Sequence, residues 1–147
     1  MTPAPFDVRD ATARDLRPLR HCMLRQGMPP DAAIFEGDDE PHTLHAAAWG
    51  EGAVVGCGSL VRRPLDGVHP AYQLRGMAVA TDWQQRGVGA AVLRHLEARA
   101  VAAGFHLLWC NARTPAVPFY ERQGWRVISD EFLVPTAGPH FKMRKDR

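Results

Sequence analysis

The segment from Leu74 to Asn111 constrains the fold more than any other part of the sequence. It contains a strand pattern, a turn with two glycines, a helical pattern, and the compact apolar run FHLLWCN. A strand–helix–strand unit of this kind needs a parallel pair of strands. A compact apolar run is typical of a strand that is buried on both faces. The sequence therefore predicts a sheet with a parallel pair.

The remaining segments predict strands that are mostly antiparallel. Thr12 and Asp15 indicate a variant of the capping box at the start of an amphipathic helix, although Pro18 counts against an uninterrupted one. The expected helices are residues 13–26, a short one at 30–36, 84–103 and 114–124. The expected strands are residues 6–10, 42–50, 53–63, 71–80, 105–111, 125–134 and 140–145. We expect an α/β (α+β) mixed sheet with helices on its faces, in one domain over residues 6–147.

Charge and hydropathy exclude several partners. The net charge of +2 gives no basis for nucleic-acid binding. No apolar run approaches the roughly 18 residues of a membrane span, and MTPAPFDVRD has no apolar stretch of signal-peptide type. We therefore expect a cytoplasmic protein that binds neither nucleic acid nor membrane.

The cysteines favour reduced thiols over a disulfide framework. There are three of them, Cys22, Cys57 and Cys110, and they lie far apart in the sequence. No CxxC or HExxH spacing is present, so we expect no metal site.

The stretch WQQRGVGAAVL places Gly87 and Gly89 where a helix should begin. Glycine inside a helix costs roughly 1 kcal/mol relative to alanine, so these glycines favour another purpose. The first N–H groups of a helix lack intrahelical partners and carry the positive end of its dipole. Without Cβ atoms, and with Arg86 adding charge, the turn suits an anion, above all a pyrophosphate.

The glycine turn fits the two common phosphate-binding motifs poorly. The dinucleotide fingerprint needs GxGxxG with an acid about 20 residues on, and only GxG is present. The P-loop pattern needs GK[ST], which does not follow. A small nucleotide-binding protein of another class, or a turn without any ligand, is the alternative.

Two linked segments carry a family resemblance. QQRGVGAAVL, preceded by LRGMAVATDW, resembles the signature of the GNAT superfamily of acetyl-CoA-dependent N-acetyltransferases, with Gln84, Gly87 and Gly89 at the matching positions. NARTPAVPFYERQGWRV resembles the downstream block of that family. Its matching residues are Asn111, Tyr120, Gly124 and Trp125. The order of predicted elements also agrees with that fold.

The resemblance implies acetyl-CoA as co-substrate, with no metal. In this family the strand before the glycine turn carries a bulge and diverges from the next parallel strand. The backbone of Met77 to Val79 would then pair with the pantetheine arm, and an N–H near Ala78 or Val79 would face the thioester oxygen of a tetrahedral intermediate. N–H groups from Gln85 to Ala90 would hold the pyrophosphate. The implied cofactor-binding residues are Met77, Ala78, Val79, Gln84, Gln85, Arg86, Gly87, Val88, Gly89, Ala90, Asn111 and Tyr120.

The resemblance also implies a catalytic acid. Tyr120 would lie near the thioester sulfur and protonate the leaving thiolate, and a phenol with a pKa near 10 suits that task. A core aromatic role is the alternative. Asn111 would contact the pantetheine or lie in a helix N-cap region. Cys110 could act as a nucleophile in a two-step route, but a buried, inert thiol is the favoured interpretation.

A base is expected because an amine must lose a proton before it attacks. The resemblance does not identify this base, since it differs between members. The candidates are His42, His45, His140, Glu36 and Glu40. His140 ranks first because of its place in the last strands.

The acceptor is not defined by any motif. The acidic stretch EGDDE, which includes Asp38 and Asp39, suggests attraction of a cationic amine such as a polyamine or a lysine side chain. A solvated loop is the alternative. A small-molecule or peptidyl amine is the expected partner, and a homodimer is expected by analogy alone. A regulatory module that binds CoA or acetyl-CoA without transferring the acetyl group is the alternative function.

Overall fold

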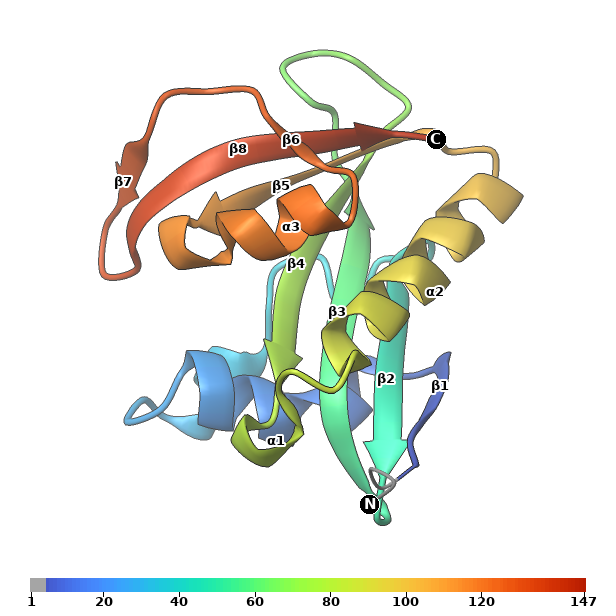
Figure 1. The fold of residues 1–147 in the computed structure, drawn as a ribbon, viewed down its shortest axis with the longest axis vertical. Coiled ribbons are helices and arrows are strands. Elements are labelled where there is room, and N and C mark those ends of the chain that lie inside the picture. The colour runs from blue at the N-terminus through green and yellow to red at the C-terminus, as the bar shows by residue number, and fades with distance from the viewer. Residues whose placement is uncertain (1–4) are drawn as a thin grey trace.

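The computed structural model of the chain describes residues 5–147, so the first four residues of MTPAPFDVRD lie outside the described part. Within this part, the strands form one sheet in the order β1-β2-β3-β4-β5-β8-β6, and β7 pairs with β8 (Figure 1). The strands are β1 (Asp7–Asp10), β2 (Leu44–Gly50), β3 (Ala53–Arg62), β4 (Tyr72–Val79), β5 (Leu107–Arg113), β6 (Arg126–Val127), β7 (Phe132–Val134) and β8 (Gly138–Asp146). The helices are α1 (Ala13–Leu24), α2 (Val88–Ala102) and α3 (Val117–Arg122), with 3₁₀ turns η1 (Pro30–Ala33), η2 (Thr81–Trp83) and η3 (Thr114–Ala116).

The parallel pair predicted by the strand–helix–strand unit is β4 with β5. These strands pair only at Tyr72 with Leu108 and at Gln73 with Trp109. The other strand pairings within residues 5–147 are antiparallel. Beyond Gln73, β4 and β5 run apart, as Figure 1 shows. The mixed sheet is confirmed, and it opens along this line of divergence.

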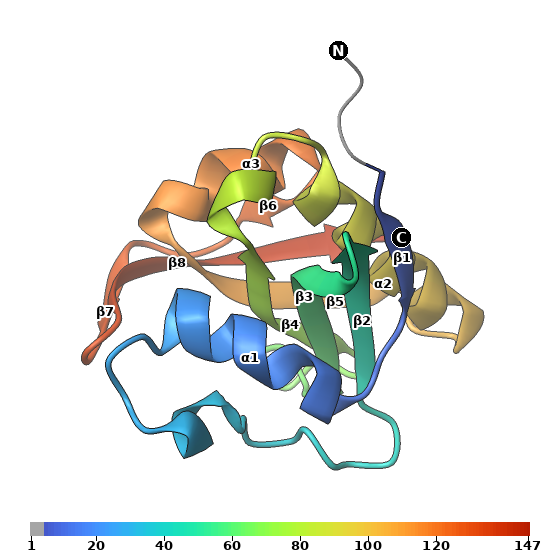
Figure 2. The same cartoon turned by 90° about the horizontal axis from the view of Figure 1, so that it is seen from below.

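Helices cover both faces of the sheet (Figure 2). On one face, Leu16 and Leu19 of α1 pack with Cys57 and Ala78. On the other face lies the larger core cluster, to which α2 contributes Val88, Val92, Leu93, Leu96 and Ala100. Each of these α2 side chains is at most 1% exposed. Burial of a side chain such as leucine or valine contributes about 1.5–3 kcal/mol, so this helix anchors the sheet.

The predicted capping box at α1 is confirmed. The N–H of Asp15 donates to the Thr12 hydroxyl at 3.2 Å, and the N–H of Thr12 donates to the Asp15 carboxylate at 2.9 Å. The helix continues through Pro18 and ends at Leu24, two residues before the predicted end. Proline therefore does not interrupt it, and the loss of one N–H donor is tolerated.

Two predicted elements begin or divide differently. The helix predicted from residue 84 begins at Val88, because Gln85 and Gly87 have φ values of 63° and 82°, which a right-handed helix excludes. The strand predicted over residues 125–134 is divided into β6 and β7, which pair with different parts of β8. Residues 128–131 connect them outside the strands.

Within residues 5–147 no helix combines the length and the hydropathy that crossing a membrane requires.

Candidate active site

A cleft opens where β4 and β5 diverge, and two cavities share its walls. The turn-side cavity, about 590 Å³, is lined by the end of β4, the glycine turn and α3. The strand-side cavity, about 510 Å³, is lined by β4, β5, and residues that follow α1 and η1. Met77, Ala116 and Tyr120 line both. These three residues therefore mark the junction at which two bound molecules could meet.

A β-bulge shapes β4 at this junction. Cys57 pairs with Ala78 and Ser59 pairs with Arg75, so Gly58 of β3 lies opposite two residues, Gly76 and Met77. Gly76 has a φ of 65°, a conformation that favours glycine. Bulges bend a strand and increase its twist. The bulge that the family resemblance implies is thus present, and the diverging part of β4 turns a backbone edge towards the cleft.

The two glycines of the glycine turn differ in their surroundings. Gly87 is the N-cap residue of α2 with a φ of 82°, and a Cβ placed there would meet no heavy atom within 4 Å. Gly87 is therefore needed for its backbone conformation, next to open space. A Cβ on Gly89 would lie 3.4 Å from the Phe119 ring, which is an ordinary van der Waals contact, so the packing of α2 against α3 leaves room for a methyl group there. The side-chain amide of Gln84 donates to the Val79 carbonyl at 3.1 Å and ties the turn to β4.

The backbone of this turn faces the turn-side cavity. The N–H groups of Val88, Gly89 and Ala90 belong to the first turn of α2 and so have no intrahelical partner. All three residues line the cavity, as do Gln84, Gln85 and Gly87. Arg86 does not line it, and its guanidinium lies over the Trp83 ring, 5.1 Å from the centroid. The positive character of the site therefore comes from backbone N–H groups, the helix dipole and Arg122 of α3, which lines the cavity, and Arg86 is not expected to contribute directly.

Tyr120 lies at the junction of the cavities and is only 7% exposed. Its ring packs against Phe119 and Trp125, at centroid distances of 5.1 and 5.6 Å. Burial, and to a lesser extent neighbouring Cys110, raises the pKa of the Tyr120 phenol above its usual value of 10.0. The phenol therefore keeps its proton at neutral pH and has that proton available to donate.

Cys110 is an unreactive thiol in this environment. It is 2% exposed, and burial raises the pKa of its thiol to about 12. A thiol needs a lowered pKa to act as a nucleophile near neutral pH. The two-step route through Cys110 is therefore disfavoured. This agrees with the buried, inert thiol that was favoured from the sequence. Among the described residues, no group of three or more histidine, cysteine, aspartate or glutamate side chains is arranged to hold a metal ion.

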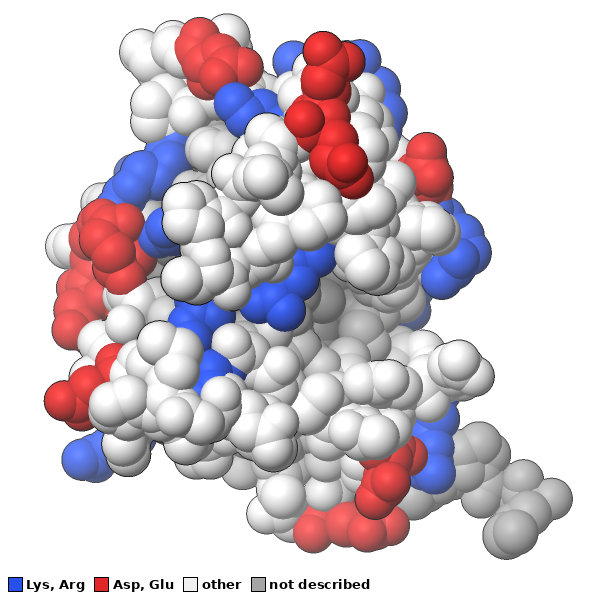
Figure 3. All heavy atoms as spheres, turned by 90° about the vertical axis from the view of Figure 1, so that its left-hand side faces the viewer, with Lys and Arg blue, Asp and Glu red and all other residues white. Residues whose placement is uncertain are grey.

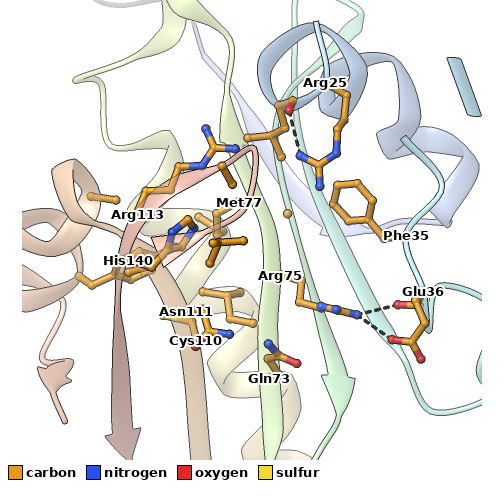
Figure 4. A pocket seen from close by; sticks show the side chains of 18 of the residues that line it. Arg25, Phe35, Glu36, Gln73, Arg75, Met77, Cys110, Asn111, Arg113 and His140 are labelled. Carbon is orange, nitrogen blue, oxygen red and sulfur yellow. Dashed lines mark hydrogen bonds and ion pairs between the residues drawn. The ribbon is translucent and has the colours of Figure 1, made fainter. Parts of the chain in front are cut away.

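Asn111 and His140 face the strand-side cavity from adjacent strands, β5 and β8 (Figure 4). Nδ1 of His140 lies 2.8 Å from the Gly138 carbonyl oxygen, which can only accept a hydrogen bond. Nδ1 therefore donates its proton in this contact, and Nε2 is the ring nitrogen left to accept one. The ring also stacks on Phe132, at 6.0 Å between centroids. This arrangement fixes the orientation and tautomer that a base requires.

The other predicted bases are held elsewhere. The ring nitrogens of His45 contact the Ser59 hydroxyl at 2.7 Å and the Asp38 carbonyl at 3.0 Å, and neither His45 nor His42 lines the cavities. Glu40 is paired with Arg63 and does not line them either. Glu36 does line the strand-side cavity, but it is paired with Arg63 and Arg75, and these hydrogen bonds lower the pKa of its carboxyl. A carboxylate stabilised in this way is a weak base.

The expected acidic surface at EGDDE does not form around Asp38. This residue is buried, and both of its carboxylate oxygens accept hydrogen bonds from Arg20, at 2.7 and 3.0 Å. Arg20 also donates to Ser59, and its guanidinium stacks on Phe35 at 4.2 Å. Burial by itself would raise the pKa of Asp38, but the hydrogen bonds from Arg20 and the Phe35 N–H outweigh it and keep the pKa below 3.8. The interpretation of Asp38 as a surface charge for a cationic amine is therefore wrong.

The strand-side cavity is basic instead. Lys and Arg side chains gather in the hollow of the face shown in Figure 3, and Asp and Glu side chains lie towards its edges. The charged residues that line the cavity are Arg25, Arg75, Arg113 and Glu36. Arg25 and Arg113 were not among the predicted site residues, because they belong to no motif and lie 88 positions apart in the sequence.

Comparisons with known proteins agree with this geometry. The family described as the Acetyltransferase (GNAT) family matches residues 9–125. An uncharacterised N-acetyltransferase of Bacillus subtilis, YjcF, is 31% identical over 121 residues, which cover 82% of this chain and 81% of that protein. A second from the same organism, YitI, is 26% identical over 142 residues, or 95% of each chain.

Solved structures share the fold. An aminoglycoside 6'-N-acetyltransferase complexed with coenzyme A superposes with a TM-score of 0.77 at 13% identity, covering 95% of this chain and 96% of that one. Escherichia coli ElaA also gives 0.77, at 16% identity, covering 97% and 100%. The family match, the relatives and the diverging strands beside a glycine turn lead to one conclusion: the chain belongs to the GNAT family and is an acyltransferase.

Proposed function

We propose that this protein transfers the acetyl group of acetyl-CoA to a primary amine, by direct attack of the amine and without an acyl-enzyme. The observation that carries the proposal is the cleft in which Tyr120 lies between the glycine turn of one cavity and the second, strand-side cavity. Two substrates can occupy such a cleft at once. The high pKa of Cys110 also argues against a covalent intermediate.

The turn-side cavity fits the phosphate end of coenzyme A. Unpaired backbone N–H groups at a helix N-terminus bind phosphates well, and the absence of side-chain atoms around Gly87 leaves room for them. The aminoglycoside enzyme of similar fold was solved with coenzyme A. From there, the edge of β4 at Met77, Ala78 and Val79 can hydrogen-bond a pantetheine arm as an added strand would.

Tyr120 and His140 then carry out one proton transfer each. Acetyl-CoA supplies the thioester that the amine attacks. An N–H of Ala78 or Val79 is the donor for the negative charge that develops on the thioester oxygen. Tyr120 holds a proton for the departing sulfur, and His140 Nε2 accepts the proton of the amine, directly or through water. Asn111 lines the strand-side cavity, and we assign to it a contact with the pantetheine.

The first experiment is thermal unfolding with acetyl-CoA, CoA, ATP and NAD, followed by thiol release with a panel of amines. A ligand at 100 times its Kd adds about 2.7 kcal/mol of stability, so acetyl-CoA and CoA should raise Tm by several degrees. A larger rise with ATP or NAD would overturn the proposal. A rise with CoA but no thiol release with any amine would favour a regulatory CoA-binding module.

Replacement of Gly87 by alanine should weaken binding of acetyl-CoA. A Cβ in the left-handed region costs about 1–2 kcal/mol, and at this position it would enter the space assigned to the phosphates. We expect Kd for CoA to rise about tenfold or more, measured by calorimetry. Gly52 is the matched control, since it also has a positive φ and open space but lies in the β2–β3 turn. Equal effects of Gly87→Ala and Gly52→Ala on CoA binding would contradict the assignment.

Replacement of His140 by alanine should reduce kcat by about 10²–10⁴-fold if it is the base. A histidine base must lose its proton before it can act, and this requirement lowers the activity at acidic pH. The variant should no longer show this acidic limb of the pH–rate profile. His42→Ala, a change outside both cavities, serves as the control. An acidic limb that is the same in His140→Ala as in the wild type would remove His140 from the mechanism.

A further inference from the structure

Two arginines of the strand-side cavity make no ion pair among the described residues. Arg25 is the C-cap residue of α1, and Arg113 is the last residue of β5. In Figure 4 their side chains extend towards the same end of the cavity from opposite walls. Within residues 5–147, the other arginine of the cavity, Arg75, is paired with Glu36. Arg25 and Arg113 are thus the cavity arginines whose charge is not already balanced.

Neighbouring groups hold the Arg25 guanidinium in place without balancing its charge. Its Nη1 donates to the Leu24 carbonyl at 2.9 Å, and its guanidinium stacks on the Phe35 ring at 4.8 Å. The same ring also contacts the guanidinium of the buried Arg20, which lies 4.2 Å from the ring centroid. Burial, and then the charges of Arg113 and Arg20, lower the pKa of Arg25. Positive charges therefore crowd this wall, and an anion would relieve their repulsion.

The carboxylates of the neighbouring EGDDE loop that could balance this charge are occupied. Asp38 binds Arg20, and Glu36 and Glu40 bind Arg63. The phosphates of coenzyme A do not balance the charge of these arginines either. The glycine turn assigned to the phosphates lies in the turn-side cavity, which neither Arg25 nor Arg113 lines. The unbalanced charge lies on the side of Tyr120 and His140 that is left for the acceptor.

We propose that Arg25 and Arg113 form a subsite for an anionic group of the acceptor, so that the substrate is an amine that also carries a carboxylate or a phosphate. The proposal rests on the proposed acetyltransferase function. Guanidinium groups bind both anions through paired, charge-assisted hydrogen bonds. Polyamines and other purely cationic amines are disfavoured by the same charge. The two arginines act on specificity and positioning, and the reacting atoms remain with Tyr120 and His140.

The test measures binding directly and does not require turnover. Protein saturated with CoA, so that the phosphate site is filled, is titrated with β-alanine, O-phosphoethanolamine, ethanolamine and spermidine at constant ionic strength. Tm is followed for the wild type, Arg25→Gln, Arg113→Gln and the double variant. Arg14→Gln is the matched control, because Arg14 is an exposed arginine of α1 that lines neither cavity. The same titrations are repeated without CoA.

We expect β-alanine or O-phosphoethanolamine to raise Tm, and the one that does so identifies the anion as carboxylate or phosphate. Each single variant should weaken that binding about ten- to a hundredfold, as expected for loss of a charge-assisted hydrogen bond, and Arg14→Gln should not. Stabilisation by ethanolamine or spermidine alone, no stabilisation by either anionic amine, or an undiminished effect in the double variant would overturn the subsite. If CoA itself fails to raise Tm, the proposed function fails instead, and the titrations without CoA still decide the subsite.

Discussion

Replacement of Asp38 by alanine should lower the free energy of unfolding by about 3–5 kcal/mol, because it leaves the buried Arg20 guanidinium without its carboxylate. Arg20 has no exposed surface, and Asp38 is 7% exposed. Asp38 also accepts a hydrogen bond from the Phe35 N–H at 2.9 Å, which the variant loses. Chemical denaturation of the two proteins measures the difference directly.

Asp39→Ala is the matched control, since it removes the neighbouring, exposed carboxylate and should change stability by no more than about 0.5 kcal/mol. If Asp38→Ala does not fold, the double variant Arg20→Met with Asp38→Leu should fold, because it removes both buried charges. Equal stability of Asp38→Ala and Asp39→Ala would contradict the role given to the pair.

The same pair predicts a dependence on pH. The pKa of Asp38 in the folded protein lies below its usual value of 3.8. Its stabilising contribution is therefore complete above the unfolded pKa and is lost as the pH falls through the folded-state pKa. We expect the acid loss of stability to be steeper in the wild type than in Asp38→Ala, as measured by denaturation at several pH values. Parallel profiles for the two proteins would argue against this titration.

Replacement of Tyr120 by phenylalanine should reduce kcat by about 10²–10⁴-fold, the contribution usual for a general acid. The aromatic contacts with Phe119 and Trp125 do not involve the hydroxyl, so the fold should be kept. Binding of CoA should stay within a few-fold of the wild type, because the phosphates bind at the glycine turn. Steady-state thiol release and calorimetry with CoA separate the two effects.

The other tyrosine of the chain provides the control. The Tyr72 hydroxyl donates to the His42 carbonyl at 2.7 Å, and Tyr72 lines neither cavity. Tyr72→Phe should cost about 1 kcal/mol of stability and leave kcat unchanged. A kcat of Tyr120→Phe within about threefold of the wild type would show that the thiolate receives its proton from another donor, such as water.

The sequence predicted those parts of the fold that depend on local patterns. Thr12 and Asp15 indicated the capping box, and the spacing of Val88, Val92 and Leu96 indicated the buried face of α2. The family resemblance of the two linked segments also implied that Asn111 and Tyr120 lie in one cleft, and both line the strand-side cavity. The start of α2 was misplaced because positive φ at Gln85, a residue that rarely adopts it, leaves no pattern in the sequence.

The charge of the cleft could not be predicted, because it depends on which side chains find partners far along the chain. EGDDE is acidic in the sequence, but Asp38 pairs with a residue 18 positions earlier and Glu40 with one 23 positions later. One signal was available in the sequence. Leu19 and Arg20 follow Leu16 by three and four positions, so Arg20 lies on the apolar face of α1. A charge there requires a buried partner.

The loop that carries Phe35 ties the wall of the strand-side cavity to the core of the protein. Phe35 and Glu36 form part of the cavity wall, and Asp38 fastens their loop to Arg20, which in turn binds Ser59 of β3. Replacement of this loop by the loop of another enzyme would leave the buried Arg20 without a carboxylate partner, unless the new loop also had an aspartate at position 38. We therefore expect the loop, Arg20 and Ser59 to tolerate exchange only together, and we expect changes at Arg25 and Arg113 to alter the proposed subsite at a smaller cost in stability than replacement of the loop.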